Sequence, residues 1–135
     1  MQKTDSKKIR YIFICTFLFC ISLSHAQKNK TYSFPEREYK SAVEMFKLEQ
    51  YGAAKDMFSL VYEAIPEKYD LRKEQSLYHM GICAAFLFHD DAEKIILTFI
   101  EEYPENAYID KLWFYLGNYY FNQSAYRKAL HAYER

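Results

Sequence analysis

The sequence has 135 residues, of which 27% are charged and 19% are aromatic. Its 18 basic and 18 acidic side chains give a formal charge of zero, which argues against a nucleic-acid-binding protein, because such proteins need a surplus of Lys and Arg to replace counterions along the phosphates. The aromatic content argues against intrinsic disorder, and the length allows at most one small domain.

The beginning of the sequence has the pattern of an export signal. Residues 1–10 carry four basic side chains and one acidic side chain, and residues 11–23 form an apolar run. Ser24-His25-Ala26 then places small residues on both sides of His25, as a cleavage site requires. We therefore expect a signal peptide over residues 1–26, followed by a flexible polar linker over residues 27–34.

Two alternatives to cleavage stay open. Residues 11–24 could remain as a membrane anchor, although the apolar run is short of the roughly 20 residues that span a bilayer as a helix. Cys20 could instead carry a lipid anchor, although the preceding Phe19 is not the small residue that such signals usually have. If cleavage follows Ala26, Cys83 is the single remaining thiol, so the exported domain forms no internal disulfide and depends on packing for its stability.

From residue 35 onward the sequence repeats with a period of about 37 residues. Ala54, Ala92 and Ala129 recur at this interval, each followed four residues later by a large apolar residue, and Pro66 and Pro104 recur at a similar interval. Apolar residues at three- and four-residue spacing predict two amphipathic helices in each unit. The fold class is therefore all-α, with units near 35–68, 72–106 and 108–135 and helices near 36–48, 52–64, 72–87, 91–102, 108–121 and 125–135.

Local signals mark the ends of the predicted helices. Pro66 and Pro104 lie just beyond the second helix of their units, where proline ends a helix. Asp90 or Asp91 is expected to cap the helix that begins near residue 91. The turn before that helix, around His89, is predicted to be one residue short.

The third unit carries the clearest family signal. Residues 113–120, Trp-Phe-Tyr-Leu-Gly-Asn-Tyr-Tyr, fit the W-x-x-L-G-x-x-Y run of the tetratricopeptide repeat (TPR), and Tyr126, Ala129 and Tyr133 continue its pattern. Residues 35–135 therefore resemble a TPR protein. The resemblance implies about three helix-turn-helix repeats, the last one truncated, stacked in a right-handed solenoid, with Gly117 and Ala129 allowing the paired helices to approach closely.

The segment from Phe99 to Tyr108, Phe-Ile-Glu-Glu-Tyr-Pro-Glu-Asn-Ala-Tyr, resembles a subset of TPRs found in bacterial cell-envelope proteins. These include the repeat domain of the Tol-Pal coordinator and the lipoprotein of the outer-membrane barrel-assembly machine. Together with the export signal, this resemblance implies a location in the periplasm or cell envelope. The third unit stops within its second helix, and solenoids need caps, so we expect either an N-terminal part of a longer envelope protein or an open end that pairs with another chain.

The sequence offers few candidates for catalysis or metal binding. Three glycines cannot build a phosphate-binding loop, and there is no G-x-S-x-G motif. His79 and Cys83 lie four residues apart, as two zinc ligands could, but a second ligand pair is missing. We therefore expect a non-catalytic protein that uses no cofactor, metal, nucleic acid or small-molecule substrate.

The resemblance instead implies a protein-binding scaffold, because the first helix of each TPR lines a concave groove that binds an extended peptide or a helix. Amide side chains there can bond a ligand backbone, and aromatic faces supply contact area, although some of the aromatic residues could pack between units instead. The alternative function is self-association into a homo-oligomer, and contact with a membrane is expected only if the N-terminal segment is retained. The helical phase places these residues in the groove: Tyr39, Val43, Phe46, Lys47, Gln75, Tyr78, Ile82, Phe86, Lys111, Phe114, Asn118, Phe121 and Asn122.

Overall fold

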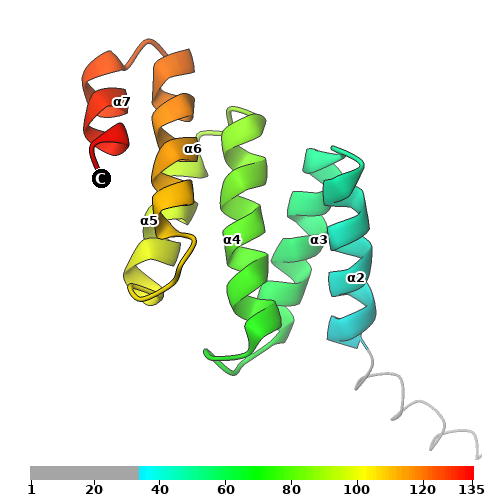
Figure 1. Cartoon of the computed structure of the whole chain (residues 1–135). Coiled ribbons are helices and arrows are strands. Elements are labelled where there is room, and N and C mark those ends of the chain that lie inside the picture. The colour runs from blue at the N-terminus through cyan, green and yellow to red at the C-terminus, as the bar shows by residue number, and fades with distance from the viewer. Residues whose placement is uncertain (1–33) are drawn as a thin grey trace, which may run out of the picture. The chain divides into compact units, whose positions relative to one another are not determined.

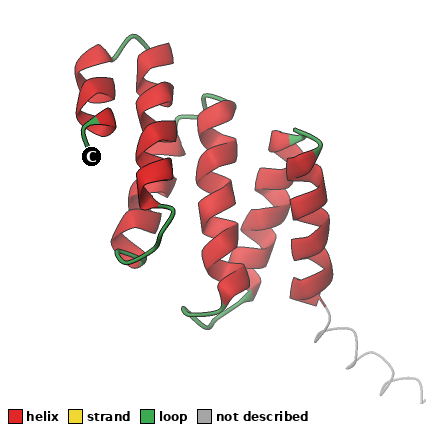
Figure 2. Cartoon of the chain, in the orientation of Figure 1, coloured by secondary structure: helices red, strands yellow, loops and turns green. Residues whose placement is uncertain are grey.

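A computed structural model describes residues 34–135 as α-helices joined by short turns, and these residues contain no β-strand (Figure 1; Figure 2). This confirms the all-α prediction. The expected signal peptide and residues 27–33 of the expected linker lie outside the described residues. Phe34, which was assigned to that linker, instead lies in a helix. The helices are α2 (Phe34–Lys47), α3 (Tyr51–Ala64), α4 (Leu71–Phe86), α5 (Ala92–Glu102), α6 (Ile109–Asn122) and α7 (Tyr126–Tyr133).

The ends of these helices agree with the predicted ranges to within two residues. The proline signals explain part of this agreement. Helices α3 and α5 end two residues before Pro66 and Pro104, because proline has no N–H to donate and its ring disfavours a helical conformation in the preceding residue.

The three turns that join α2 to α3, α4 to α5 and α6 to α7 share one backbone conformation. The second residue after the first helix has a positive φ in each turn, 59° at Glu49, 54° at Phe88 and 61° at Ser124. In the first turn the Glu49 N–H bonds the Phe46 carbonyl and the Gln50 N–H bonds the Met45 carbonyl, at 3.0 and 2.9 Å. The other two turns repeat this pair of bonds. This is the Schellman ending, which usually has glycine at the left-handed position.

The α4–α5 connection corrects two sequence predictions. It spans residues 87–91 and is longer than the other two turns, which span 48–50 and 123–125, so the prediction of a shortened turn is wrong. The one residue by which this unit is shorter than the other two is lost from the start of α5. The Ala92 N–H bonds the His89 carbonyl at 3.0 Å, and the helix begins only at Ala92. Asp91 occupies the N-cap position, but its carboxylate pairs with Lys55 Nζ at 2.7 Å instead of capping α5.

Residues 35–135 form one compact unit in which helices adjacent in the sequence also pack together in space (Figure 1). One cluster of buried side chains joins α2, α3 and α4, and a larger one joins α4 to α7. Close helix approach depends on Gly81 and Gly117. A Cβ atom at Gly81 would lie 2.9 Å from Ile96 Cγ1, and one at Gly117 would collide with the Tyr133 ring. The atoms nearest to that Cβ position at Gly117 all belong to the Tyr133 ring.

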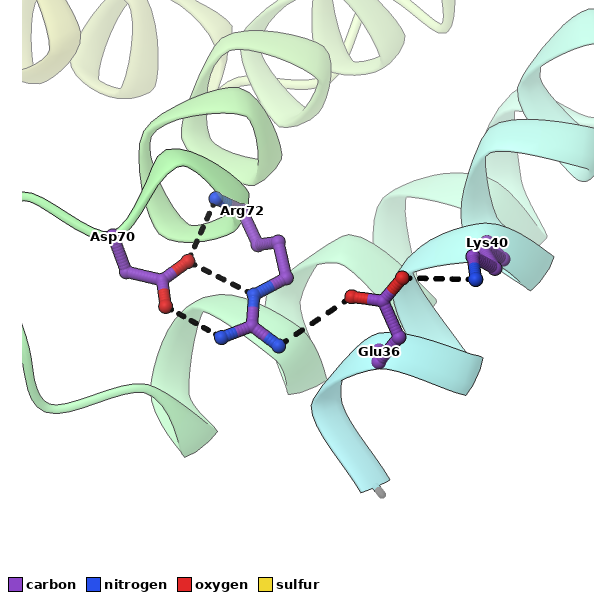
Figure 3. Close-up of polar contacts among 4 residues, drawn as sticks. All are labelled: Glu36, Lys40, Asp70 and Arg72. Carbon is purple, nitrogen blue, oxygen red and sulfur yellow. Dashed lines mark hydrogen bonds and ion pairs between the residues drawn. The ribbon is translucent and has the colours of Figure 1, made fainter. Parts of the chain in front are cut away.

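A chain of charged groups ties the start of α4 to α2 (Figure 3). Asp70 caps α4, since its Oδ1 atom accepts a hydrogen bond from the Arg72 backbone N–H at 2.8 Å. The Arg72 guanidinium bonds the same carboxylate and lies 3.5 Å from Glu36 Oε2, while Lys40 Nζ lies 2.9 Å from Glu36 Oε1. Hydrogen bonds from the Arg72 side chain lower the pKa of Asp70 from its ordinary value.

Candidate functional site

The residues predicted to line a groove lie on α2, α4 and α6, the first helix of each pair. The structure brings only some of them together. Tyr39 on α2 donates a hydrogen bond from its hydroxyl to Gln75 Oε1 on α4, so these two residues form one polar contact between neighbouring helices. Lys47 and Lys111 are exposed, and Lys47 Nζ pairs with Glu44 at 2.8 Å within α2.

Tyr78 differs from its predicted role as a groove residue. Only 7% of the residue is exposed, and its ring packs against Phe99 and Tyr108 with centroids 5.8 and 5.1 Å away. Burial raises the pKa of Tyr78 to about 12. The physical reason is the central position of α4, which packs against α2, α3, α5 and α6 and has eight buried residues, whereas α2 has two. Ile82 is buried on the same helix, with 2% of its surface exposed.

The predicted residues of α6 form a more open group. The Asn118 Oδ1 atom accepts a hydrogen bond from the Tyr133 hydroxyl at 2.7 Å, and the Asn122 Nδ2 atom donates to the Asn118 carbonyl at 2.8 Å. These bonds hold both amides in place and leave the Asn118 Nδ2 and Asn122 Oδ1 atoms without a partner among residues 34–135. Phe114 and Phe121 are each 56% exposed.

A cavity of about 200 Å³ lies between α4 and α6 and includes both of these amides. The ring of Phe86 on α4 meets the ring of Tyr115 on α6 edge to face, with centroids 5.5 Å apart. The cavity therefore combines aromatic walls with amide groups fixed on one side. Its lining residues are Ala85, Phe86, Phe88, Tyr115, Asn118, Tyr119 and Asn122.

Three of these lining residues were predicted from the sequence and the others were not. Phe86, Asn118 and Asn122 were expected from the helical phase, whereas Phe88 and Tyr115 were not. Phe88 lies in the α4–α5 turn, outside the periodic pattern of a helix. Phe88 shares its left-handed conformation with Glu49 and Ser124, so the three residues hold the same place in their turns. An alignment of the three turns in the sequence is the signal that could have drawn attention to Phe88.

His79 and Cys83, the most metal-like pair in the sequence, are both used in packing. The His79 ring stacks on Phe58 with centroids 4.8 Å apart, and its Nδ1 atom lies 2.7 Å from the Gln75 carbonyl oxygen. Burial lowers the pKa of His79. Cys83 has no exposed surface, and burial raises the pKa of its thiol to about 12, so the reactive thiolate is suppressed at neutral pH. Within residues 34–135 no group of three His, Cys, Asp or Glu side chains is placed to hold a metal ion.

A second hollow, of about 380 Å³, lies between α5, α6 and α7 on the other side of α6. The repeat pattern of the sequence does not predict this hollow. One wall is Trp113, the single tryptophan of the chain, and the Arg135 guanidinium lies 5.5 Å from the Trp113 ring centroid. Lys128 pairs with Glu93 at its edge, at 3.2 Å. Because Trp113 lies here and not in the cavity beside Asn118, its fluorescence can distinguish binding at the two places.

Within the part of the chain that the structure describes, every helix is too short or too polar to cross a bilayer. No protein-family model, no curated protein and no solved structure matches the chain. A functional conclusion therefore depends on the residues and geometry of the molecule itself.

Proposed function

We propose that the protein is a non-catalytic scaffold that binds an extended segment of a partner protein across α2, α4 and α6, with one apolar side chain of that segment held in the cavity beside Asn118. The cavity carries this proposal, because it places exposed aromatic rings next to amide groups that can still bond a ligand backbone. The residues that define it are Phe86, Asn118 and Asn122.

The size of the cavity favours a peptide side chain over a small-molecule substrate. Sites that enclose a drug-sized ligand measure about 300–1,000 Å³, and the cavity between α4 and α6 measures about 200 Å³. That volume suits a single Leu, Met or Phe side chain. The remaining contacts would come from the exposed surface on both sides of the cavity, where Tyr39 and Gln75 form a polar contact and Lys47 and Lys111 are exposed.

The TPR resemblance supports the same reading. In a TPR-like solenoid of three repeats, α2, α4 and α6 would line the concave face and α3, α5 and α7 the convex face. The recurrence of the same left-handed turn after α2, α4 and α6 favours this arrangement. The export pattern of residues 1–26 adds a location to the proposal, namely the periplasm or envelope of a bacterium.

Photo-crosslinking in the native cell tests the proposed groove. A photoreactive phenylalanine replaces Phe86, which is 44% exposed, and in the control it replaces Leu60, which is 50% exposed on α3. We expect a discrete crosslinked partner from position 86 and none from position 60, and the partner band should weaken when Asn122→Asp adds a charge beside the cavity. Equal crosslinking at both positions, or none at position 86 in folded protein, would contradict the proposal.

The fluorescence of Trp113 supplies a second test once a partner segment is known. A segment that enters the cavity beside Asn118 should leave the Trp113 emission unchanged. A segment that quenches Trp113 and binds equally well to the Asn122→Asp variant would use the hollow between α5, α6 and α7 and overturn the proposed site.

A further inference from the structure

The hollow between α5, α6 and α7 is larger than the cavity beside Asn118 and is not part of the proposed groove. Its volume of about 380 Å³ falls in the range of sites that enclose a small molecule, about 300–1,000 Å³. Its floor is mainly apolar, with Leu97 from α5, Trp113 and Tyr120 from α6, and Ala132 from α7. We call this site the Trp113 hollow.

The edge of the Trp113 hollow is mainly basic. Arg127, Lys128 and His131 lie on α7 and are exposed, whereas Glu93 on α5 is the single acidic residue of the lining. Lys128 Nζ pairs with Glu93 at 3.2 Å, so these two charges offset each other. Arg127 forms no ion pair with any other residue in the range 34–135. Its guanidinium is therefore free to bind an anion at this edge.

The preceding unit shows which of these charges holds the helices together. The repeated alanines align the second helices of the units, with shifts of 38 and 37 positions between Ala54, Ala92 and Ala129. At these shifts the Lys128–Glu93 pair corresponds to Asp91–Lys55, which is also an ion pair, at 2.7 Å and with the two signs exchanged. A charged pair between successive second helices therefore recurs in the fold, and Lys128 is accounted for by packing.

Arg127 and Trp113 are not accounted for in this way. The counterpart of Arg127 in the second unit is Asp90, which has the opposite charge. In the register that aligns the glycines of α4 and α6, the counterpart of Trp113 is Leu77, which is buried, whereas Trp113 is only partly buried. An accessible tryptophan beside an unpaired guanidinium is therefore not repeated in the second unit.

Helices that come later in the chain leave this side of a unit open. With α6 and α7 in place, the residues of the second unit that correspond to the three basic residues at the edge are all exposed, namely Asp90, Asp91 and Lys94. A further helix pair stacked in the same register would therefore leave the edge of the Trp113 hollow accessible to a ligand.

We propose that the Trp113 hollow binds a small amphipathic carboxylate, with its apolar part against Trp113 and Leu97 and its carboxylate at Arg127. The indole and leucine side chains supply apolar contact area. The planar guanidinium presents paired N–H donors that match the two oxygens of a carboxylate. The occupant is therefore a singly charged anion that carries an apolar chain or ring.

The charges at the edge favour a carboxylate over other head groups. An ammonium group would be repelled by Arg127 and by Lys128. A doubly charged phosphate would be repelled by Glu93 more strongly than a carboxylate, because Coulomb repulsion increases with charge. The Tyr120 hydroxyl and Lys128 lower the pKa of Glu93 from its ordinary value, so this carboxyl is ionised at neutral pH.

The emission of Trp113 tests the proposal directly, because Trp113 is the single tryptophan of the chain and binding elsewhere does not change its surroundings. The full chain is titrated with octanoate while tryptophan emission is recorded. We expect a saturable shift to shorter wavelength as octanoate displaces water from the ring. Octanol and octylammonium have the same apolar chain without the carboxylate, and each should bind at least about fivefold more weakly. Acetate, which has the carboxylate without the chain, should cause no shift.

Two variants at the edge, Arg127→Glu and His131→Glu, should each weaken octanoate binding by about fivefold or more, because each places a negative charge beside the carboxylate. Lys68→Glu makes the same change of charge as Arg127→Glu on an exposed residue of the α3–α4 connection and should leave the affinity unchanged. Circular dichroism checks that all three variants keep their helical content, and the two separate edge positions guard against one variant failing to fold.

Three outcomes would overturn the proposal. They are equal affinity for octanoate and octanol, equal binding of octanoate to the Arg127→Glu and Lys68→Glu chains, and no shift of Trp113 emission in the folded protein. None of these outcomes bears on the cavity beside Asn118, which the Phe86 crosslink tests separately with a partner protein.

Discussion

A shift of 75 residues places Glu49 on Ser124 and Phe58 on Tyr133. In this register the α2–α3 and α6–α7 pairs present nearly the same side chains, but their exposure differs. Phe58 has no exposed surface, whereas Tyr133, at the equivalent position, is 43% exposed. The difference arises from the neighbouring helix, because α4 covers the first pair and none of the described helices covers the outer side of the second. Burial in this molecule is therefore a property of which helix follows, and the residue type at a position does not predict it.

The same comparison separates local from tertiary effects. The turns of the two pairs have the same backbone conformation, with φ of 59° at Glu49 and 61° at Ser124. This conformation does not depend on whether the adjacent surface is covered, so it belongs to the helix pair itself. Substitutions at equivalent positions of the two pairs can measure each contribution.

The largest difference in the cost of a substitution is expected at the position held by Phe58 in the first pair and Tyr133 in the second. Phe58 is covered by α4, whereas Tyr133 is partly exposed to solvent. Phe58→Ala should lower the free energy of unfolding by about 3–5 kcal/mol, because it leaves a cavity in a fully buried site. Tyr133→Ala should cost only about 1–2 kcal/mol, since part of the ring is already in water and the main losses are its contact with Gly117 and its hydrogen bond to Asn118. Guanidinium denaturation followed by circular dichroism measures both, and equal costs would contradict the comparison.

The pH dependence of stability should reveal the histidine that covers the α2–α3 surface. Burial lowers the pKa of His79 from its ordinary value of 6.5, so the unfolded chain binds this proton more tightly than the folded one. The stability that comes from neutral, buried His79 is therefore fully present above pH 6.5 and is lost as the pH falls below that value. The carboxyl of Asp70 does not contribute in this range, because its pKa is lowered from 3.8.

Denaturant midpoints at pH 7.5 and pH 5.5, for the wild type and for His79→Phe, measure this effect. The variant should lose less stability than the wild type between the two pH values. A wild-type decrease that persists unchanged in His79→Phe would assign the pH dependence to other groups. Within residues 34–135 no histidine ring packs on the α6–α7 surface in the way that His79 packs on α2–α3. Because position 133 is 43% exposed, Tyr133→His should leave the pH dependence nearly unchanged.

The turns should respond equally in both pairs. Glu49→Gly and Ser124→Gly each remove a side chain from a left-handed conformation that glycine adopts without strain, and each should raise the free energy of unfolding by about 0.5–1 kcal/mol. Differential scanning calorimetry measures the two shifts in melting temperature. A gain at one turn and a loss at the other would show that the turns are not equivalent.

The smallest effect is expected where the two pairs differ in sequence. Leu130→Lys gives α7 the residue that α3 has at Lys55 and should change the free energy of unfolding by less than about 0.5 kcal/mol, since Leu130 is 59% exposed. Urea denaturation at neutral pH checks this value. A loss above about 1 kcal/mol would mean that Leu130 is already covered in the free protein.

Much of the fold could be predicted because its signals are local. The helix ranges follow from apolar spacing, and Pro66 and Pro104 mark two of the ends. The capping prediction for Asp91 was wrong for a tertiary reason, since Lys55 on α3 binds the carboxylate that would otherwise cap α5. In the candidate site, Asn118 and Asn122 were predictable from helical phase, whereas the burial of Tyr78 and the contribution of Phe88 depended on how α4, α5 and α6 meet.

The sequence by itself predicted helices across residues 36–135 and placed their ends to within two residues of the observed ones, because helix formation depends on the period of apolar residues and on residues adjacent in the chain. The tertiary structure alone decided which aromatic residues are buried, which amides remain free to bind a ligand, and which surface stays open. Most of those outcomes depend on contacts between different helices, and several of these join residues more than thirty positions apart, such as Phe46 with His79, Tyr51 with Phe86 and Tyr39 with Gln75. A helical period shows that one side of a helix will be covered, but only packing decides which helix covers it.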